Sequence, residues 1–345
     1  MINFYLVSKG FCGVLYLIEN ISVEEFRGIK RLLRPLELGA FNIIVGRNDS
    51  GKSAVLEALY LFPDPEEIDP LFGSTKIAVL ERIYTQRRFL IYGYWGSATL
   101  EYRVGNYEFS LTLSLESIKK EVLESSSEGV RGLHLLDVGY DEYHAALKQE
   151  EIDPKKFSIL IKSSDLFVEL SENYVYSSWD AAVKEGLNVS IVNQIINPSV
   201  DEKYTELLKY EGDLRLRKTV DDKILYIRLR DLGSGVYRAI VFCSAIALLN
   251  PRLVLWDDFE TSLHHSLNAK ILRWLSDRDQ VVITTQSIDT LVAAYEADIE
   301  DLRVILLRRL KNDIIDYKVI HKDELEDLLE SNVDPRKLVD LVGVR

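Results

Sequence analysis

Residues 46–53 read Gly46-Arg47-Asn48-Asp49-Ser50-Gly51-Lys52-Ser53, a complete phosphate-binding loop of the form G-x-x-x-x-G-K-S. An apolar run, 41–45, precedes the loop, and a helix-like stretch, 54–60, follows it. The glycines let successive backbone N–H groups turn toward one phosphate, and the helix dipole adds positive potential there. Lys52 can then reach the β- and γ-phosphates of a nucleotide, and the Ser53 hydroxyl can ligate Mg²⁺. The loop predicts a site for ATP and Mg²⁺, although a Gly-rich strand-to-helix turn also occurs without a ligand.

Chain length limits the possible domain organisation, and net charge limits the possible binding partners. The chain has 345 residues, 47% of them hydrophobic, and a net charge of −13. This length fits one large α/β domain with an inserted lobe, or two domains. The negative charge argues against a uniformly basic nucleic-acid surface, although local basic stretches can either contact phosphate or simply be solvated.

Cysteine usage and hydropathy indicate the compartment. Cys12 and Cys243 are the only cysteines, and their separation and apolar surroundings favour small core residues in a reducing compartment. The apolar stretch Phe11–Ile18 is too short to span a bilayer, and it lacks the basic start and cleavage site of a signal peptide. We therefore expect a soluble, cytoplasmic protein that does not contact the membrane.

The N-terminal part, residues 1–113, combines the phosphate loop with β-rich runs. Strands are expected at Asn3–Val7, Gly13–Ile18, Ile21–Phe26 and Asn42–Val45. Further β-rich runs separated by glycine turns predict an antiparallel meander, with strands at Ile77–Tyr84, Phe89–Tyr94, Thr99–Val104 and Tyr107–Leu113. Residues 114–210 mix helical and strand-like pieces and predict an inserted α/β lobe. No heptad pattern persists there, so long coiled-coil arms are not expected.

The C-terminal part, residues 211–345, alternates strands with helices. The expected strands are Ile224–Leu229, Leu253–Trp256, Gln280–Thr284 and Arg303–Leu307. The expected helices are Val236–Leu249, Ser266–Ser276, Ile288–Glu296 and two short helices at the C-terminus. Strands separated by helices imply a sheet with parallel members. The predicted fold class is therefore α/β, with a mixed sheet core flanked by helices.

Two acids close the strand at 253–256. A carboxylate at the carboxyl end of such a strand, beside a phosphate loop, can hold the magnesium shell, which makes Asp257 the metal candidate. The next residue would face the water that attacks the γ-phosphate, which makes Asp258 the candidate general base. An acidic helix N-terminus would give the same sequence, since Asp pairs well with the helix dipole. The presence of the loop at 46–53 favours the site.

Several further segments occur along the chain in an order that is typical of one ATPase family. Residues 21–30 (ISVEEFRGIK) and 42–53 (NIIVGRNDSGKS) supply an opening strand and a Walker A loop. Residues 231–238 (DLGSGVYR) stand at the place of a signature segment, 257–265 (DDFETSLHH) at that of Walker B and the D-loop, and 280–287 (QVVITTQS) at that of the switch strand. These segments resemble the RecF/OLD/SMC-like branch of ABC-type ATPases. The resemblance covers about the first 60 residues and 224–295.

That resemblance implies a P-loop NTPase of ABC-ATPase type in which two heads sandwich two nucleotides. The partner would be a second copy of the chain, in an ATP-dependent homodimer. By resemblance, Ser234 and Gly235 of one head would touch the γ-phosphate held by the other. A Gly-Ser-Gly turn at a helix start is an anion site in its own right, while a plain N-cap serine is the alternative. Arg47 would touch the nucleotide or the opposite head, or lie on the surface as an ordinary arginine.

Departures from the family pattern concern catalysis. Asp258 stands where the family has Glu, and Gln286 stands where it has a histidine that can take up a proton. Because small misplacements can cost about 100-fold in phosphoryl transfer, slow hydrolysis is expected. Glu260 is a further carboxylate that could position water. Gln86 is the candidate for the glutamine that senses Mg²⁺ and the γ-phosphate.

The leading hypothesis is a slowly hydrolysing ATPase that dimerises around ATP and acts in DNA repair or anti-phage defence, with DNA and a partner nuclease or effector as its other partners. The alternative is a non-hydrolysing nucleotide sensor or scaffold. A P-loop kinase or GTPase is disfavoured, because no Asn-Lys-x-Asp base-reading segment occurs and the signature and switch segments would go unexplained.

Overall fold

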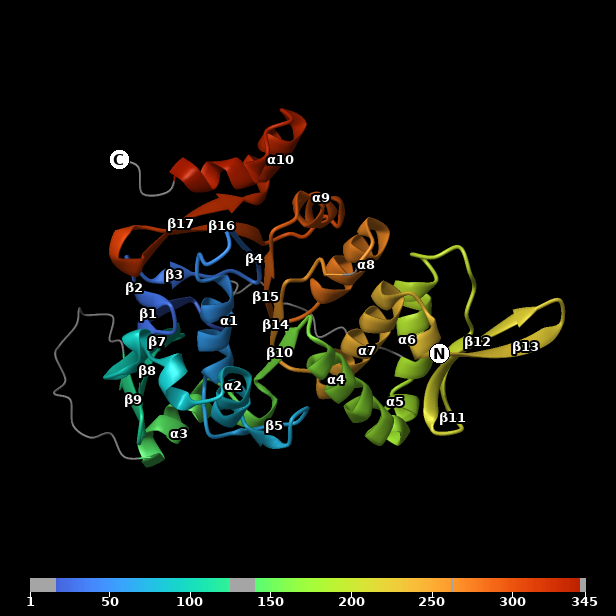
Figure 1. The fold of residues 1–345 in the computed structure, drawn as a ribbon, viewed down its shortest axis with the longest axis horizontal. Helices are drawn as coiled ribbons and strands as arrows, with labels where there is room; N and C mark the ends of the chain where they lie inside the picture. The colour runs from blue at the N-terminus through green and yellow to red at the C-terminus, as the bar shows by residue number, and fades with distance from the viewer. Residues whose placement is uncertain (1–16, 125–139, 262, 342–345) are drawn as a thin grey trace.

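One large sheet forms the centre of the molecule (Figure 1). The computed structural model describes residues 17–124, 140–261 and 263–341. The strand predicted at Asn3–Val7, most of the strand predicted at Gly13–Ile18, and Cys12 lie outside these residues, while Cys243 is buried as predicted.

The strands of the large sheet are β1 (Asn20–Phe26), β2 (Ile29–Leu32), β3 (Leu36–Glu37), β4 (Phe41–Gly46), β7 (Ser97–Val104), β8 (Tyr107–Ser114), β9 (Ile118–Glu124), β10 (Ser158–Lys162), β14 (Leu253–Asp257), β15 (Gln280–Thr285), β16 (Leu302–Arg309) and β17 (Ile314–His321). The α-helices are α1 (Lys52–Leu61), α2 (Lys76–Tyr84), α3 (Tyr140–Gln149), α4 (Asp165–Ser177), α5 (Trp179–Lys184), α6 (Leu187–Ile191), α7 (Ser234–Leu249), α8 (His265–Leu275), α9 (Ile288–Glu296) and α10 (Lys322–Glu330). The smaller sheets join β5 (Ile68–Asp69) with β6 (Ser74–Thr75), and β11 (Glu206–Tyr210) with β12 (Asp213–Val220) and β13 (Lys223–Arg228).

The large sheet is mixed. Its order is β10-β14-β15-β4-β16-β17-β2-β1-β7-β8-β9, with β3 paired to β1. Strands β10, β14, β15, β4 and β16 run parallel to one another. From β1 to β9 the pairing is antiparallel. The predicted α/β class, with a mixed sheet flanked by helices, is confirmed.

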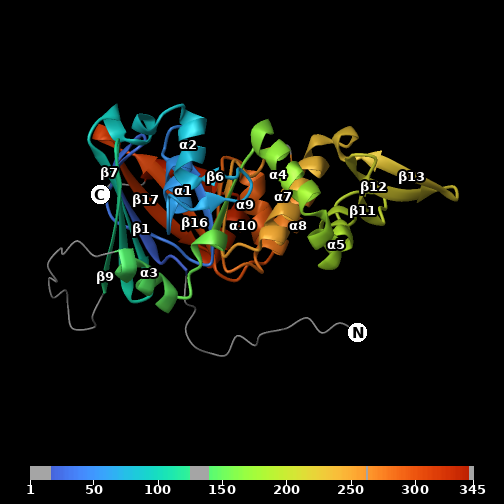
Figure 2. The same ribbon diagram turned by 90° about the horizontal axis from the view of Figure 1, so that it is seen from below.

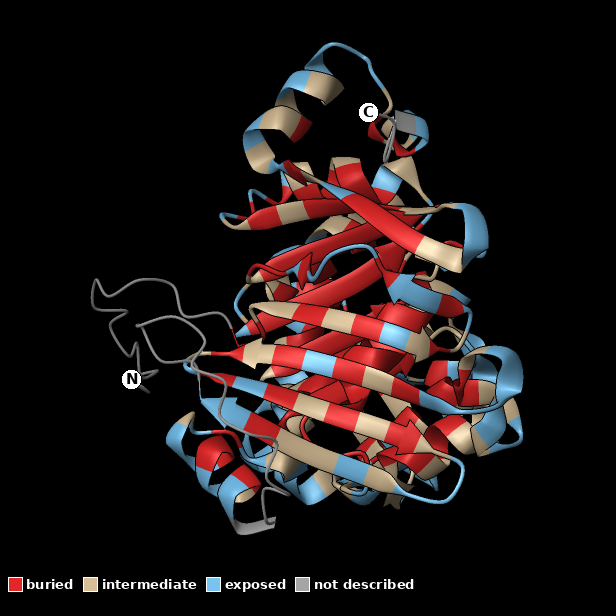
Figure 3. Ribbon diagram, turned by 90° about the vertical axis from the view of Figure 1, so that its left-hand side faces the viewer, coloured by how far each residue is buried: buried red, intermediate tan, exposed pale blue. Residues whose placement is uncertain are grey.

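The sheet curves around α1, the helix that follows the phosphate loop (Figure 2). This helix packs on β14 and β10 of the parallel part and on β1 of the antiparallel part. All residues of α1 except Ser53 are buried. The helix has apolar side chains on all its faces, as is typical of a helix enclosed in a protein core. The antiparallel strands alternate buried and exposed residues (Figure 3), and Tyr102 on β7 donates a hydrogen bond to the Ala58 carbonyl of α1 (2.6 Å). Charged groups on α1 must therefore find partners inside the protein.

The predicted meander is half correct. Thr99–Val104 and Tyr107–Leu113 are strands, and β9 adds a third to them. The strand predicted at Ile77–Tyr84 is wrong, because this segment is helix α2. Its apolar residues also fit a helical face, and the Thr75 hydroxyl accepts a hydrogen bond from the Ala78 N–H at the helix start (3.3 Å).

The strand predicted at Phe89–Tyr94 is also wrong. The segment forms 3₁₀ turns at Arg87–Leu90 and Tyr92–Tyr94. Gly93 has a left-handed φ of 65°, which interrupts an extended chain. The aromatic residues there suggested a strand, but they line a surface hollow instead.

The C-terminal part has the predicted alternation, with corrections. The segment predicted at Ile224–Leu229 is a strand, β13, but it belongs to the small antiparallel sheet and not to the large one. Strand β17 was not predicted, nor was β10 as an edge of the parallel part. The predicted boundary at residue 210 falls between β11 and β12, which pair with each other. Within the described residues, no helix is both long and apolar enough to cross a membrane.

Candidate functional site

The loop at 46–53 joins a buried strand, β4, to the buried helix α1. Gly46 has no room for a side chain, because a Cβ there would lie 2.3 Å from Ser50 Oγ and 2.8 Å from the Leu307 carbonyl oxygen. Gly51 precedes α1 with a left-handed φ of 96°, a conformation that suits glycine. The Ser50 hydroxyl is buried and has no hydrogen-bond partner among the described residues. The two glycines thus produce the tight turn that a phosphate cradle needs.

Lys52 folds back over the loop. Its ammonium donates hydrogen bonds to the carbonyls of Gly46 (3.0 Å) and Arg47 (3.1 Å). Burial lowers the pKa of Lys52, and the charges of Asp258 and Asp257 oppose that effect only in part. A buried ammonium with carbonyl partners alone retains most of its attraction for an anion such as a phosphate.

Asp257 meets Ser53 at the carboxyl end of the parallel strands. Ser53 donates a hydrogen bond to Asp257 Oδ1 (3.1 Å), and Thr284 on β15 donates to the same oxygen (2.6 Å). The pairings β14–β15 and β15–β4 place these strand ends side by side. This edge is where open α/β sheets bind ligands.

These oxygens suit magnesium. Mg²⁺ prefers hard oxygen ligands and is commonly held by one or two protein groups, with water and substrate phosphates completing its shell. The Ser53 hydroxyl and the Asp257 carboxylate provide such a pair. Among the described residues, no group of three or more His, Cys, Asp or Glu could hold a metal ion by itself. The donor set therefore fits a cation that arrives with a nucleotide.

Asp258 lies beside the metal candidate with a left-handed backbone (φ 50°). Its N–H donates to Thr284 Oγ1 (2.8 Å), and its carbonyl accepts from the Ser163 hydroxyl (2.9 Å). The side chain makes no hydrogen bond among the described residues and is half-buried. Burial, followed by the nearby charges of Asp257 and Glu260, raises the pKa of Asp258. A carboxylate without a fixed partner and with a raised pKa suits a general base.

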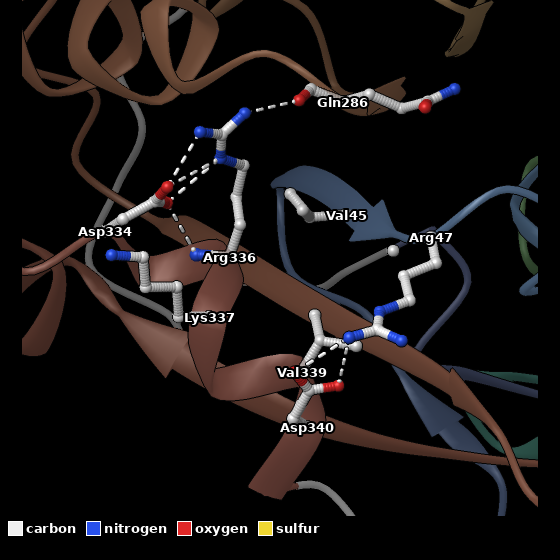
Figure 4. Close-up of a pocket in the computed structure, with 9 residues that line it drawn as sticks. Val45, Arg47, Gln286, Asp334, Arg336, Lys337, Val339 and Asp340 are labelled. Carbon is white, nitrogen blue, oxygen red and sulfur yellow. Dashed lines mark hydrogen bonds and ion pairs between the residues drawn. The ribbon is translucent and has the colours of Figure 1, made fainter.

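Glu260 and Gln286 are joined at the switch. The Gln286 N–H donates to Glu260 Oε1 (2.8 Å), while Glu260 Oε2 is buried and has no partner in the described part of the chain. The Gln286 side chain is exposed, and the backbone carbonyl oxygen of Gln286 accepts a hydrogen bond from Arg336 (2.8 Å). Figure 4 shows the Gln286 side chain pointing away from Arg336. Glu260 thus fixes the switch backbone, and the Gln286 amide stays free to meet a ligand.

A C-terminal 3₁₀ segment, Pro335–Leu341, lies against the start of the phosphate loop (Figure 4). Exposed Arg47 makes an ion pair with Asp340 (2.8 Å). With Gly46 and Gln286, this segment lines a pocket of about 300 Å³. Arg47 is therefore held on the surface by the chain's own C-terminal part.

Asn48 and Asp49 form the exposed tip of the loop. Asp49 has a left-handed φ of 63°, and its carbonyl accepts a hydrogen bond from Arg309 Nε (2.6 Å). Arg309 also makes an ion pair with the Asp49 carboxylate (3.2 Å). These contacts anchor the loop tip to β16.

Three predicted residues lie apart from this constellation. Ser234 and Gly235 begin α7, where Ser234 is exposed, and no hydrogen bond among the described residues links them to the loop. Gln86 is exposed after α2, and its side chain makes no hydrogen bond in the described part of the chain. A role for Ser234 and Gly235 requires a second molecule, and one for Gln86 requires a ligand or a movement.

A buried charge cluster behind the metal candidate was missed. Glu57 on α1 is fully buried and accepts hydrogen bonds from Lys162 (2.6 Å), Tyr84 (2.6 Å) and Arg27. Lys162, the last residue of β10, also contacts Asp257 Oδ2 (3.2 Å). Burial would lower the pKa of Lys162, but the charges of Glu57 and Asp257 outweigh it and raise that pKa. The sequence signal for this cluster was Glu57 itself, a single acid within an apolar helix, one turn after Ser53.

Two hollows open beside the loop. One, of about 160 Å³, is lined by the loop itself together with Arg27, Gly28 and Arg309. A wider one, of about 670 Å³, shares these three residues and is walled by aromatic side chains: Tyr84, Phe89, Tyr92 and Tyr94. A polar cradle thus continues into an aromatic hollow. This arrangement suits a nucleotide, whose charged phosphates are joined to a base that can stack on aromatic rings.

Two family models match the chain. Residues 17–180 match the model described as "AAA ATPase domain". Residues 176–293 match one described as "AAA domain, putative AbiEii toxin, Type IV TA system". The first match includes the phosphate loop, and the second includes Asp257 and Gln286. A protein of Methanocaldococcus jannaschii named Uncharacterized protein MJECL10 is 25% identical over 200 residues, which cover 56% of this chain and 85% of that protein.

Solved structures of SMC heads share the fold. An SMC head bound to the C-terminal winged-helix domain of ScpA superposes with a TM-score of 0.57 at 12% identity, covering 91% of this chain and 99% of that chain. A Pyrococcus furiosus SMC head with an extended coiled coil, bound to the C-terminal domain of ScpA, gives a TM-score of 0.54 at 12% identity, covering 92% and 99%. At this identity the likeness concerns the fold alone.

Proposed function

We propose that the chain, which matches two AAA ATPase family models and shares the fold of SMC heads, binds ATP with Mg²⁺, dimerises around the nucleotide and hydrolyses it slowly. The observation that carries this proposal is the 3.1 Å hydrogen bond from the Ser53 hydroxyl to Asp257 Oδ1. These two residues are far apart in the sequence. It supports one site for the phosphates and their metal.

Each residue has a task in this proposal. The loop N–H groups and Lys52 would bind the phosphates, and Ser53 and Asp257 would hold Mg²⁺. Bound there, the metal would neutralise charge on the transferred phosphoryl group. Asp258 would accept the proton of the attacking water, positioned with help from Glu260 and Gln286. The aromatic hollow that begins at Arg27 would take the base by stacking.

The exposed start of α7 supports the proposed dimerisation, because no hydrogen bond among the described residues links Ser234 to the phosphate loop. The exposed start of α7 presents backbone N–H groups that no other group of the described chain satisfies by a side-chain cap. A helix N-terminus of this kind attracts a phosphate. In the proposed dimer, Ser234 and Gly235 of one copy would cover the γ-phosphate held by the other.

Two variants test the proposal. Lys52→Ala should abolish ATP binding, and Asp258→Asn should bind ATP and accumulate as a dimer, because hydrolysis no longer releases it. Oligomeric state with ATP and Mg²⁺ would be measured by light scattering, with the Lys52→Ala protein as the control. An Asp258→Asn protein that binds ATP yet stays monomeric would contradict the sandwich.

The second candidate function is a non-hydrolysing nucleotide sensor or scaffold. The short arm of Asp258 and the Gln286 amide, which cannot take up a proton near neutrality, favour it. Phosphate release with Mg²⁺ separates the two functions: a measurable turnover supports the ATPase, and binding without turnover supports the sensor.

We place the biological role in DNA repair or anti-phage defence, with DNA and a partner nuclease or effector as the proposed partners. The toxin–antitoxin description of the second family model supports the defence role. The same phosphate-release assay, repeated with duplex and nicked DNA, tests it: stimulation supports a DNA partner, and an unchanged rate contradicts one.

A further inference from the structure

A lysine occupies the inner side of the candidate magnesium site. The two oxygens of Asp257 have different partners: Oδ1 accepts from Ser53 and Thr284, and Oδ2 lies 3.2 Å from the Lys162 ammonium. The Lys162 side chain is only 14% exposed, and that of Asp257 only 8%. In such surroundings a neighbouring charge is weakly screened.

The buried charges of Arg27, Glu57 and Lys162, behind the candidate magnesium site, balance only when Asp257 is counted with them. Glu57 is already neutralised by Arg27, with which it forms an ion pair, and it also accepts a hydrogen bond from the Tyr84 hydroxyl (2.6 Å). Lys162 contacts both Glu57 (2.6 Å) and Asp257 (3.2 Å). Because Arg27 already balances Glu57, Lys162 leaves one positive charge in the cluster, and Asp257 is the acid that balances it. Its ammonium serves the Asp257 carboxylate as a built-in counter-ion.

We propose that Lys162 is a positioning residue that sets the magnesium requirement of the site. It orients the Asp257 carboxylate before the metal arrives, and its charge weakens the hold of that carboxylate on a divalent cation. The inference rests on the proposed function, since it concerns the same ATP site. Its consequence is a metal site that releases Mg²⁺ more readily than Ser53 and Asp257 alone would.

The test is the Mg²⁺ concentration that half-saturates binding of a fluorescent ATP analogue to the full chain, at fixed pH and ionic strength. Lys162→Gln removes the charge but can still donate hydrogen bonds to Glu57 and Asp257, and Arg27 keeps Glu57 paired. It should lower the half-saturating Mg²⁺ concentration by about ten-fold, as expected when a positive charge beside a divalent cation is removed at a partly buried site. Lys162→Arg keeps the charge and should stay within about three-fold of wild type.

A half-saturating concentration that is unchanged or higher in Lys162→Gln would overturn the inference, and so would an equal fall in Lys162→Arg. Lys162→Met replaces the glutamine variant if that variant does not fold, with the same fall expected. The two proposals fail differently. A wild-type protein that binds no nucleotide at any Mg²⁺ concentration overturns the ATP site itself, whereas normal wild-type binding with no effect of Lys162 overturns only the present inference.

Discussion

The buried carboxylate of Glu57 should be one of the most sensitive positions for stability. Its side chain is 0% exposed, because α1 is enclosed between the two parts of the sheet, and it accepts hydrogen bonds from Arg27, Tyr84 and Lys162. Glu57→Gln removes the negative charge and turns an amide toward Arg27 and Lys162, which can only donate hydrogen bonds. Lys162 keeps Asp257 as a partner, but Arg27, 21% exposed, loses the one carboxylate that it pairs with among the described residues.

Breaking a buried pair in this way costs about 3–5 kcal/mol. For a chain of this length a urea m-value of about 3–4 kcal/mol/M is reasonable, so the unfolding midpoint should fall by about 1 M. Urea unfolding followed by tryptophan fluorescence and circular dichroism would measure this shift. Coincident unfolding curves from the two probes would show that a single transition is being compared.

A matched control is Glu81→Gln. Glu81 also pairs with an arginine, Arg87, at 2.6 Å, but the two side chains are 30% and 26% exposed. This loss should stay below about 1 kcal/mol, because water solvates the remaining charge. Equal midpoints for the Glu57 and Glu81 variants would refute the view that Glu57 holds the interior charges in balance.

Two further predictions concern the loop and its chemistry. Gly46→Ala should lower ATP affinity by about 100-fold or more and stability by about 1–3 kcal/mol, because the new Cβ would meet Ser50 Oγ at 2.3 Å. In the control Gly73→Ala, the new Cβ meets nothing within 4 Å, so ATP affinity should be unchanged. Equal ATP dissociation constants for the two variants, measured by calorimetry, would contradict the predicted effect of Gly46→Ala. ATP turnover should fall as pH decreases through the raised pKa of Asp258, since the base must be deprotonated. On the alkaline side, ATP affinity should fall as pH rises through the lowered pKa of Lys52; steady-state rates and binding that are flat between about pH 4 and 10 would count against both assignments.

Local patterns predicted the parts of the site that depend on neighbours in sequence. The strand, loop and helix around 46–53 have the predicted bounds to within two residues, because the glycines, the apolar run and the helix start all lie within one segment. Asp257 was predicted at a strand end for the same reason. At Ile77–Tyr84, β-rich composition suggested a strand, but the Thr75 cap and the helical spacing of the apolar residues decided the structure.

The missed residues depend on long-range pairing. Lys162 and Glu57 are 105 positions apart, and Lys162 and Asp257 are 95 positions apart. They meet only because β10 adds to the edge of the sheet beside β14, and the sequence contains no local signal for that pairing. In the sequence, Lys162 is simply a charged residue after an apolar run, which is the usual end of a strand.

The segment that follows β10 connects the two halves of the proposed mechanism. Lys162 contacts Asp257, and the next residue, Ser163, donates a hydrogen bond to the Asp258 carbonyl (2.9 Å). On its other side, Ser163 accepts a hydrogen bond from Arg238 of α7, the helix that begins at Ser234. Helix α4, which starts two residues later, packs along α7. In the proposed dimer, the segment beside Asp257 and Asp258 of one copy would therefore be bonded to the helix that covers the nucleotide of the other copy. This link would make the ATP site and the start of α7 one coupled unit.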